Sequence, residues 1–325
     1  MHVAVIGAGA IGAYVGAALA RGGTQVTLVA RGAHLAALRE HGVRVESPRG
    51  DFHVHPSATD DMRTIGPVDV VILALKAHQI APIVDDVRTL FHAETAVVAM
   101  QNGIPWWSFA GDPGPYENRP VRSVDPDGRI AAAIEARRVV GCVIYSSTEI
   151  ASPGVIRHIE GTRYSLGDPV RGVAARTQAI AQAFVAGGLK APVEADLRVD
   201  IWLKLLGNAA FNPISALTRA TLVEMCDDPD VEALTAEMMR EALDVAAQLN
   251  VTVPISIEKR IDGARRVGAH KTSMLQDLEG RKPLELDAVV GAVVELGAIC
   301  GVPTPATRHV YALTKLLERS ILAGR

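Results

Sequence analysis

The sequence is poor in cysteine, and the few cysteines lie far apart. Cys142, Cys226 and Cys300 are spread over 325 residues, and no two have the spacing of a zinc knuckle or a redox CxxC motif. This predicts reduced thiols, as in a cytoplasmic protein. His53 and His55 alternate along one strand face, but no convincing third ligand is near, so we expect no bound metal.

The sequence also lacks an excess of charge and a long apolar run. It has 33 basic and 36 acidic side chains, a formal net charge of −3, which gives no broad field to attract nucleic acid or an anionic membrane. No apolar run approaches the roughly 18 residues of a membrane span. The start of the sequence shows neither the basic segment nor the cleavage site of a secretory signal. We expect a soluble, unprocessed cytoplasmic protein with no nucleic-acid or membrane partner.

The first thirty residues contain a complete strand, turn, helix and strand pattern. Apolar residues predict strands over 3–6 and 26–30, and a helix over 13–20. The turn between them is a GxGxxG motif made of Gly7, Ala8, Gly9, Ala10, Ile11 and Gly12. Such glycines allow a tight turn and a close backbone approach to a pyrophosphate, with helix amides facing the phosphate oxygens. A glycine-rich turn without ligand is the alternative, but the complete unit favours dinucleotide binding.

Arg31 follows the second of these strands, where an NAD-binding protein usually has an acidic residue. A guanidinium there would pair with the 2′-phosphate of NADP(H), whereas a carboxylate would repel it. We therefore expect NADPH to be preferred over NADH. The alternative is that Arg31 is a solvated loop residue, with Arg39 and Arg44 close by in the sequence.

Two further apolar runs end in polar residues that can reach a ligand. Residues 68–75 precede Lys76, and residues 96–100 precede Asn102. Because ligands lie outside the carboxyl ends of parallel strands, both side chains are candidates for cofactor or substrate contact. The alternatives are an ordinary exposed lysine and an Asn-Gly hairpin turn.

Residues 111–128 are rich in Pro, Gly and Asp and predict an insertion or flap rather than core. Trp106 and Trp107 precede this loop; they could cover a site, but we expect them to anchor the loop. Strands are predicted over 139–145 and 155–158.

After Ala195 the alternation of strands and helices gives way to long helical patterns. With roughly 150 residues per domain, this predicts a cofactor-binding domain over 1–194 and a helical substrate and catalytic domain over 195–325. The predicted fold class is an α/β Rossmann-like domain with a mostly parallel sheet, followed by an all-α domain.

Lys204, Asn208 and Asn212 recur every four residues in an otherwise apolar segment, so on a helix they form one polar stripe. Buried amides without partners cost roughly 1 to 3 kcal/mol each, which favours a stripe that lines a cleft. The alternative is a snorkelling lysine beside two asparagines bonded to backbone. We expect Pro213 to end or kink the helix.

A final candidate segment carries Ser273, Gln276 and Glu285. Ser273 and Gln276 fit a capping box. Glu285 fits the first turn of a helix, but it also lies on that helix's apolar stripe, where a carboxylate needs a cation. Lys204 is the obvious candidate.

The chain resembles the ketopantoate reductase family (2-dehydropantoate 2-reductases) over nearly its whole length. The matching features, in the family's order and at similar spacing, are the GxGxxG turn with Arg31, Lys76 in Leu-Lys-Ala-His-Gln, Gln101-Asn102-Gly103, Ser152-Pro153-Gly154, the Lys204, Asn208 and Asn212 helix, Ser273-Met-Leu-Gln-Asp, and Glu285-Leu-Asp287. Residues 106–128 depart from it, because the compact family members have a shorter connection there.

The resemblance implies a Rossmann domain that binds NADPH, a helical domain, and an active site where the two meet. It implies that Lys204 is the general acid. The residues matching Asn208, Asn212, Ser273 and Glu285 are implied to bind the substrate's carboxylate and hydroxyl groups or to tune the lysine, with Glu285 grouped with Lys204 as catalytic. Those matching Lys76 and Asn102 are implied to lie at the nicotinamide end of the cleft, and we expect Asn102 to contact substrate as well.

The expected reaction is NADPH-dependent reduction of 2-dehydropantoate to (R)-pantoate, a step towards pantothenate and coenzyme A. Two alternatives stay open: reduction of another 2-oxo acid, and a non-catalytic NADPH-sensing protein. The expected partner is a small-molecule 2-oxo acid. A homodimer is a further hypothesis, because helical domains offer apolar faces that can pair.

Overall fold

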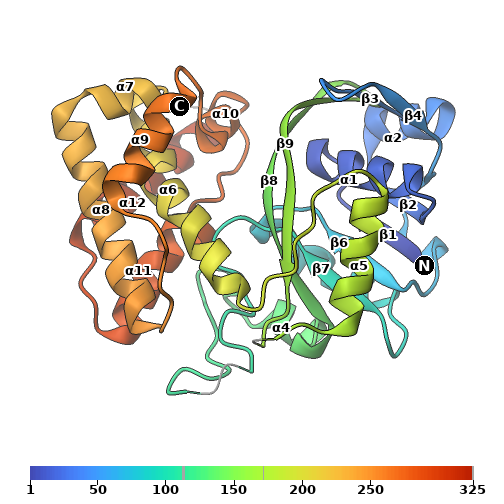
Figure 1. Cartoon of the computed structure of the whole chain (residues 1–325), viewed down its shortest axis with the longest axis horizontal. Coiled ribbons are helices and arrows are strands. Elements are labelled where there is room, and N and C mark those ends of the chain that lie inside the picture. Colours follow the sequence, from blue (N-terminus) through green and yellow to red (C-terminus); the bar gives the residue numbers. More distant parts are fainter. Residues whose placement is uncertain (112–113, 171, 324–325) are drawn as a thin grey trace. The chain divides into compact units, whose positions relative to one another are not determined.

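The computed structural model describes residues 1–111, 114–170 and 172–323, which form two compact units (Figure 1). The first unit comprises Met1–Gln101, Phe109–Arg119 and Gly128–Leu197. The second comprises Asn102–Ser108, Pro120–Asp127 and Arg198–Arg325. Two short loop segments from the first half of the sequence are thus grouped with the helical second unit.

The first unit is built around a single sheet. Its elements are β1 (His2–Ile6), α1 (Ala10–Arg21), β2 (Gln25–Val29), α2 (Gly32–His41), β3 (Val43–Glu46), β4 (Phe52–Val54), β5 (Ser57–Thr59), β6 (Val70–Leu73), α3 (Val84–Arg88), β7 (Ala96–Ala99), α4 (Arg129–Ala133), β8 (Val139–Ser152), β9 (Val155–Gly167) and α5 (Ala175–Ala186). Among the described residues the sheet has nine strands in the order β4-β3-β9-β8-β7-β6-β1-β2-β5. The pairings from β5 to β8 are all parallel, and β9 turns back antiparallel on β8. The prediction of a mostly parallel, Rossmann-like sheet is confirmed.

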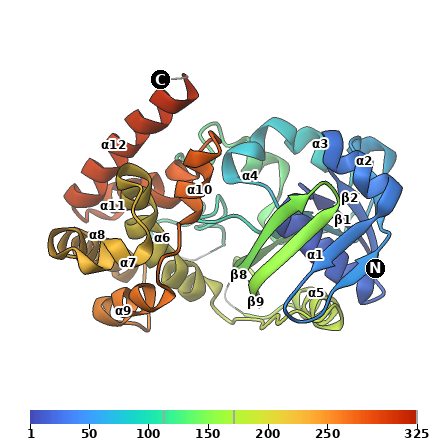
Figure 2. The same ribbon diagram turned by 90° about the horizontal axis from the view of Figure 1, so that it is seen from above.

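The central strands are apolar because both of their faces are covered. Every residue of β6 and β7 is buried, as expected for parallel strands between layers of helix. Helix α1 packs against β8 and β9 and beside α5. The strands predicted over 139–145 and 155–158 are parts of the longer β8–β9 hairpin, whose two strands lie side by side in Figure 2.

The second unit is helical. Its elements are α6 (Leu197–Thr218, whose first residue belongs to the first unit), α7 (Leu222–Asp227), α8 (Pro229–Gln248), α9 (Ile257–Val267), α10 (Ser273–Glu279), the π-helical turn η5 (Asp287–Gly291), α11 (Ala292–Cys300) and α12 (Pro305–Leu322). This confirms the predicted helical second half.

Helix α6 contains Pro213. Of the two outcomes expected of this proline, an end or a kink, the end is wrong, because the helix continues to Thr218. A proline removes a single helical hydrogen bond. Phe211 and Ile214, on either side of it, are 3% and 4% exposed, and we attribute the continuity of the helix to this packing.

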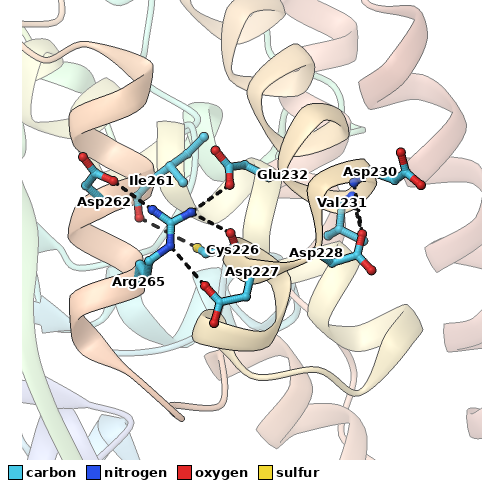
Figure 3. Close-up of polar contacts among 9 residues, drawn as sticks. All are labelled: Cys226, Asp227, Asp228, Asp230, Val231, Glu232, Ile261, Asp262 and Arg265. Atoms are coloured by element: carbon cyan, nitrogen blue, oxygen red, sulfur yellow. Dashed lines mark hydrogen bonds and ion pairs between the residues drawn. The ribbon is translucent and has the colours of Figure 1, made fainter.

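One arginine ties three of these helices together (Figure 3). Arg265 on α9 donates to Asp227 on α7 at 3.2 Å, to Glu232 on α8 at 2.7 Å and to Asp262 on its own helix at 2.9 Å. It also donates to the Cys226 carbonyl oxygen at 2.6 Å. We call these five residues the Arg265 cluster.

Candidate active site

Three of the predicted residues form a continuous set of hydrogen bonds within the second unit. Lys204 lies on α6, Asn102 lies three residues after the end of β7, and Glu285 lies in the bend just before the helix that contains η5. Lys204 Nζ donates to Asn102 Oδ1 at 2.7 Å, and Asn102 Nδ2 donates to Glu285 Oε2 at 3.0 Å. All three side chains are half-buried. We call them the Lys204–Asn102–Glu285 network.

Opposite charges fix the orientation of the Asn102 amide. Its oxygen faces the ammonium of Lys204, and its NH2 group faces the carboxylate of Glu285. The flipped amide would set donor against donor and acceptor against acceptor, so only one orientation satisfies both neighbours. The carboxylate was expected to need a cation, and the structure places Asn102 between the two charges.

A close backbone contact holds Asn102 in place. Gly103 has a φ of +83°, and a Cβ at this residue would collide with the Ala288 carbonyl group. The next amide, Ile104 N–H, donates to Ala288 O at 2.9 Å. In η5, the Ala292 N–H donates to Asp287 O rather than to Ala288 O. The π-helical turn therefore leaves the Ala288 carbonyl oxygen available to accept from Ile104 N–H in the loop after Asn102. The Asn102-Gly103 pair therefore does not form a hairpin turn, and its backbone packs against the Ala288 carbonyl group instead.

The network borders a narrow hollow of about 210 Å³. It is lined by Asn102, Asn212, Ser273, Met274, Asp277, Glu285 and Val289. The structure thus brings four predicted residues together, with Lys204 joined to them through Asn102. Asn208 lies one turn beyond Lys204 on α6, half-buried and outside this lining.

Helix α10 begins one residue away from the prediction. Thr272, not Ser273, is its N-cap, and the Thr272 hydroxyl accepts from Leu275 N–H at 3.3 Å. A threonine satisfies a helix N-terminus as well as a serine does, so the sequence did not distinguish the two residues. Ser273 is the first helical residue, and its hydroxyl is not needed as the cap.

Sequence reasoning did not single out Asp277, Met274 or Val289 as lining residues. Asp277 lies four residues after Ser273, so the two share one face of α10, and this spacing was a usable signal. Met274 and Val289 are buried apolar residues that resemble any other part of the core.

The glycine turn of the first unit fits a bound dinucleotide. Gly7 has a φ of +91°, and a Cβ on Gly12 would collide with the Gly7 carbonyl oxygen, so both positions exclude larger residues. Gly9 faces open space: a Cβ there would meet no atom within 4 Å. It is the N-cap of α1, whose first turn has no side-chain cap and no acidic residue. Ala8, Ala10 and Ile11 complete the turn, which leaves helix amides free to face a phosphate.

Arg31 and Lys76 also lie in the first unit, at the ends of β2 and β6. Arg31 is exposed and is the N-cap residue of α2. Lys76 is half-buried, and its N–H donates to Gln79 Oε1 at 3.1 Å. Gln101 Nε2 bonds the Leu73 and Leu75 carbonyl oxygens at 2.7 and 3.1 Å, which secures the chain that leads to Lys76.

One histidine near the glycine turn is held neutral. Burial lowers the pKa of His34 on α2 below its usual value, against a hydrogen bond with the Ala8 backbone that raises it. Its Nδ1 accepts from Gly154 N–H at 3.1 Å, which requires the unprotonated nitrogen. The start of α2 thus adds no charge from this ring at neutral pH.

The loop that follows Asn102 is anchored rather than free. Trp106 and Trp107 are 5% and 4% exposed, as expected for anchoring residues. Glu295 on α11 accepts from the N–H groups of Arg122 and Ser123, both at 2.7 Å. Asp112 and Pro113, within the predicted flap, lie outside the described residues.

Two features are absent from the described residues. No group of three or more His, Cys, Asp or Glu in this part of the chain could hold a metal ion. Over the same residues, no helix is long and apolar enough to cross a membrane.

A Rossmann-like sheet with a glycine turn, joined to a helical unit that carries a lysine, an amide and a carboxylate, defines a nicotinamide-dependent oxidoreductase. The chain belongs to the ketopantoate reductase family. The protein-family model described as ketopantoate reductase PanE/ApbA matches residues 3–170, and the family model of the ketopantoate reductase C-terminal region matches residues 196–318.

Known proteins resemble the chain over almost its full length. The 2-dehydropantoate 2-reductase of Mesorhizobium japonicum is 46% identical over 318 residues, which is 98% of each chain. The crystal structure of a provisionally named ketopantoate reductase from Ralstonia solanacearum MolK2 has a TM-score of 0.93 at 41% identity and covers 98% of each chain. A dimeric ketopantoate reductase from Staphylococcus aureus shares the fold, with a TM-score of 0.74 at 20% identity over 99% of this chain and 100% of that one.

Proposed function

We propose that this protein catalyses the NADPH-dependent reduction of 2-dehydropantoate (ketopantoate) to (R)-pantoate, a step of pantothenate and coenzyme A biosynthesis. The M. japonicum relative carries the name of this activity. The observation that carries the proposal is the 2.7 Å hydrogen bond from the Lys204 ammonium to the amide carbonyl oxygen of Asn102. A ketone oxygen is an acceptor of the same kind, and an ammonium has three N–H groups, so Lys204 can donate to a substrate carbonyl while Asn102 holds it in position.

In this proposal Lys204 is the general acid. The turn from Gly7 to Gly12 would hold the reduced nicotinamide cofactor, which would supply the hydride for the substrate's carbonyl carbon. Negative charge then develops on the ketone oxygen, where the Lys204 ammonium stabilises it and donates the proton. The Glu285 carboxylate keeps the Asn102 amide oriented through the 3.0 Å hydrogen bond.

We assign substrate binding to Asn102, Asn208, Asn212 and Ser273. Amides and hydroxyls can donate to a carboxylate and exchange hydrogen bonds with a hydroxyl, the two polar ends of ketopantoate. Asn212, Ser273 and Asn102 line the hollow next to Glu285, which supports the assignment. Because that hollow is narrow, substrate binding requires the side chains that line it to move apart.

We assign cofactor binding to the turn from Gly7 to Gly12, with Arg31 on the 2′-phosphate and Lys76 and Asn102 towards the nicotinamide. The open face of Gly9 and the uncapped start of α1 support the phosphate assignment. The exposed guanidinium at the end of β2 supports NADPH over NADH.

We further propose that residues 1–194 are the cofactor domain, that residues 195–325 are the substrate and catalytic domain, and that the protein is a cytoplasmic homodimer. The glycine turn in the first unit and Lys204 in the second support the division of roles. Three cysteines without close spacing are consistent with the cytoplasm, and the dimeric S. aureus relative supports the dimer.

A substrate panel tests the function. NADPH oxidation is measured with ketopantoate, with the same 2-oxo acid lacking the terminal hydroxyl, and with larger branched 2-oxo acids. We expect the highest kcat/KM for ketopantoate. Preference for the acid that lacks the hydroxyl would assign another 2-oxo acid, and NADPH binding without turnover of any acid would identify a sensor.

A further inference from the structure

The backbone on the N-terminal side of Glu285 is held by a buried carboxylate. Leu284 N–H donates to Glu318 Oε1 on α12 at 2.8 Å. Leu284 and Glu318 are only 4% and 8% exposed. Because Leu284 precedes the helix, its N–H has no acceptor within a preceding turn of helix, and α12 supplies that acceptor.

The residue two places after Glu285 is held by the same helix. Tyr311 Oη donates to Asp287 Oδ1 at 2.6 Å, and Lys315 Nζ donates to Asp287 Oδ2 at 2.7 Å. Lys315 also forms an ion pair with Glu318 Oε2 at 3.4 Å. The lysine therefore connects the two attachments on either side of Glu285.

These contacts come from one face of α12. Tyr311, Lys315 and Glu318 are spaced four and three residues apart, so they lie along one stripe of the helix. Gly291 lets the Tyr311 ring approach η5, since a Cβ at this glycine would lie 3.0 Å from the ring. The stripe is thus packed against the segment that it holds.

Glu285 itself lies in the bend where the helix begins, and its carbonyl oxygen accepts from Val289 N–H at 3.1 Å. Leu284 and Asp287, which flank it, are the residues held by α12. Its carboxylate is the terminus of the Lys204–Asn102–Glu285 network, and a displacement of its backbone would be passed on to Asn102 through the 3.0 Å hydrogen bond. A misplacement of about 1 Å can cost a reaction about a hundredfold in rate. The position of this short segment therefore matters to Lys204.

We infer that Glu318, together with Asp287, Tyr311 and Lys315, forms a clamp that positions Glu285 and, through Asn102, the ammonium of Lys204. None of the four touches the substrate in this account; they are positioning residues that act through Glu285. The inference rests on the proposed function for its kinetic consequences, and on the geometry of α12 for its structural ones.

The test compares Glu318→Ala and Glu318→Gln with Glu241→Ala. Glu241 is a matched control because it is also a buried carboxylate that accepts backbone N–H groups of α12, those of Ala306 and Thr307 at 2.8 and 2.9 Å, but at the other end of the helix. We expect Glu318→Ala to lower kcat about tenfold at an unchanged Kd for NADPH. Glutamine retains an oxygen that accepts from Leu284, so Glu318→Gln should stay within about twofold of wild type. Glu241→Ala should lower Tm but keep kcat within about twofold of wild type.

Two further measurements do not depend on turnover. Amide hydrogen exchange at Leu284 should be about tenfold faster in Glu318→Ala than in wild type, and unchanged in Glu318→Gln. A crystal structure of Glu318→Ala should show the bond between Asn102 Nδ2 and Glu285 Oε2 lengthened or broken. If the wild type reduces no 2-oxo acid, the proposed function fails, while these two measurements still decide the clamp.

Equal kcat values for Glu318→Ala and Glu241→Ala would overturn the clamp, and so would an unchanged network in the crystal structure. Should Glu318→Ala fail to fold, Tyr311→Phe takes its place, because it removes one hydrogen bond to Asp287 and keeps the ring on Gly291. We expect it to lower kcat about threefold. A kcat equal to that of wild type would contradict the inference.

Discussion

The Lys204–Asn102–Glu285 network and the Arg265 cluster both consist of polar side chains among the helices of the second unit, but they are connected differently. Arg265 donates to three carboxylates and a backbone carbonyl, so the loss of one acceptor leaves three. In the network Lys204 donates to Asn102, and Asn102 donates to Glu285, so one neutral amide connects an ammonium on α6 with a carboxylate more than 80 residues further along the chain. The Arg265 cluster holds three helices together, whereas the network orients one ammonium that can donate a proton.

Replacement of Lys204 should give the largest effect and the sharpest contrast. We expect Lys204→Ala to lower kcat about a thousandfold, because the proton donor and the charge at the ketone oxygen are both lost. Tm should change little, since the lysine side chain is only half-buried. Lys204→Arg, which keeps a cation that cannot release its proton, should not restore the rate. Steady-state kinetics and thermal melts give both values, and a kcat near wild type for Lys204→Ala would remove the lysine from the mechanism.

Arg31, in the first unit, can be compared with Arg265. Arg265 binds side chains of three helices, whereas we assign the exposed Arg31 to the binding of a ligand. We expect Arg31→Ala to raise the KM for NADPH about 10- to 100-fold and the KM for NADH by much less, since only NADPH loses a charge-assisted contact. Titrations with both cofactors measure this. Equal losses for the two cofactors would show that Arg31 does not read the 2′-phosphate.

The Arg265 cluster predicts the reverse pattern from Lys204. Arg265→Ala should lower Tm by a few degrees, because the ion pairs that connect α9 to α7 and α8 are lost, while kcat stays at the wild-type value. High salt should shrink the difference in Tm, since the guanidinium is partly exposed and its ion pairs are screened. A fall in kcat without a fall in Tm would mean that the two polar groups are not separate in function.

The smallest predicted effect is a loss of stability in alkali at the clamp of α12. Burial, and then the hydrogen bond to Asp287, raise the pKa of Tyr311 above its ordinary value of 10.0. Burial alone would lower the pKa of Lys315, but its bonds to Asp287 and Glu318 raise the pKa overall from 10.5. Groups whose pKa is raised by folding stabilise the protein fully below the unfolded pKa and lose that contribution as the pH rises towards the folded one. Stability should therefore fall above a pH of about 10.

Tyr311→Phe isolates this effect. The variant lacks one of the two titrating groups, so the free energy of unfolding of the wild type should fall more steeply with pH than that of the variant above pH 10. Urea unfolding at a series of pH values measures the slopes. Parallel slopes would contradict the raised pKa of Tyr311.

Local patterns explain what the sequence could predict. The glycine turn and the flanking strands follow from apolar runs and from backbone requirements within about thirty residues. Lys204 and Asn212 are eight residues apart, which is close to two turns of a helix, so helical geometry alone predicts that they lie on one face. The structure has helices and strands at the positions that these patterns predict.

Contacts between distant residues explain what the sequence could not predict. Asn102 lies 102 residues before Lys204 and 183 before Glu285, so no periodicity could place it between them. The continuation of α6 through Pro213 depends on tertiary packing, and the π-helical turn that frees Ala288 depends on a loop from the other half of the sequence. The intrinsic helix propensity of the residues predicts neither the continuation of α6 nor the π-helical turn.

The structure of the ternary complex with NADP+ and pantoate tests the central claim most directly. We expect Lys204 Nζ about 3 Å from the C2 oxygen of pantoate, with Asn102 still bound to Lys204 and to the Glu285 carboxylate. A Lys204 side chain directed away from that oxygen, with pantoate bound and the nicotinamide in place, would contradict the account.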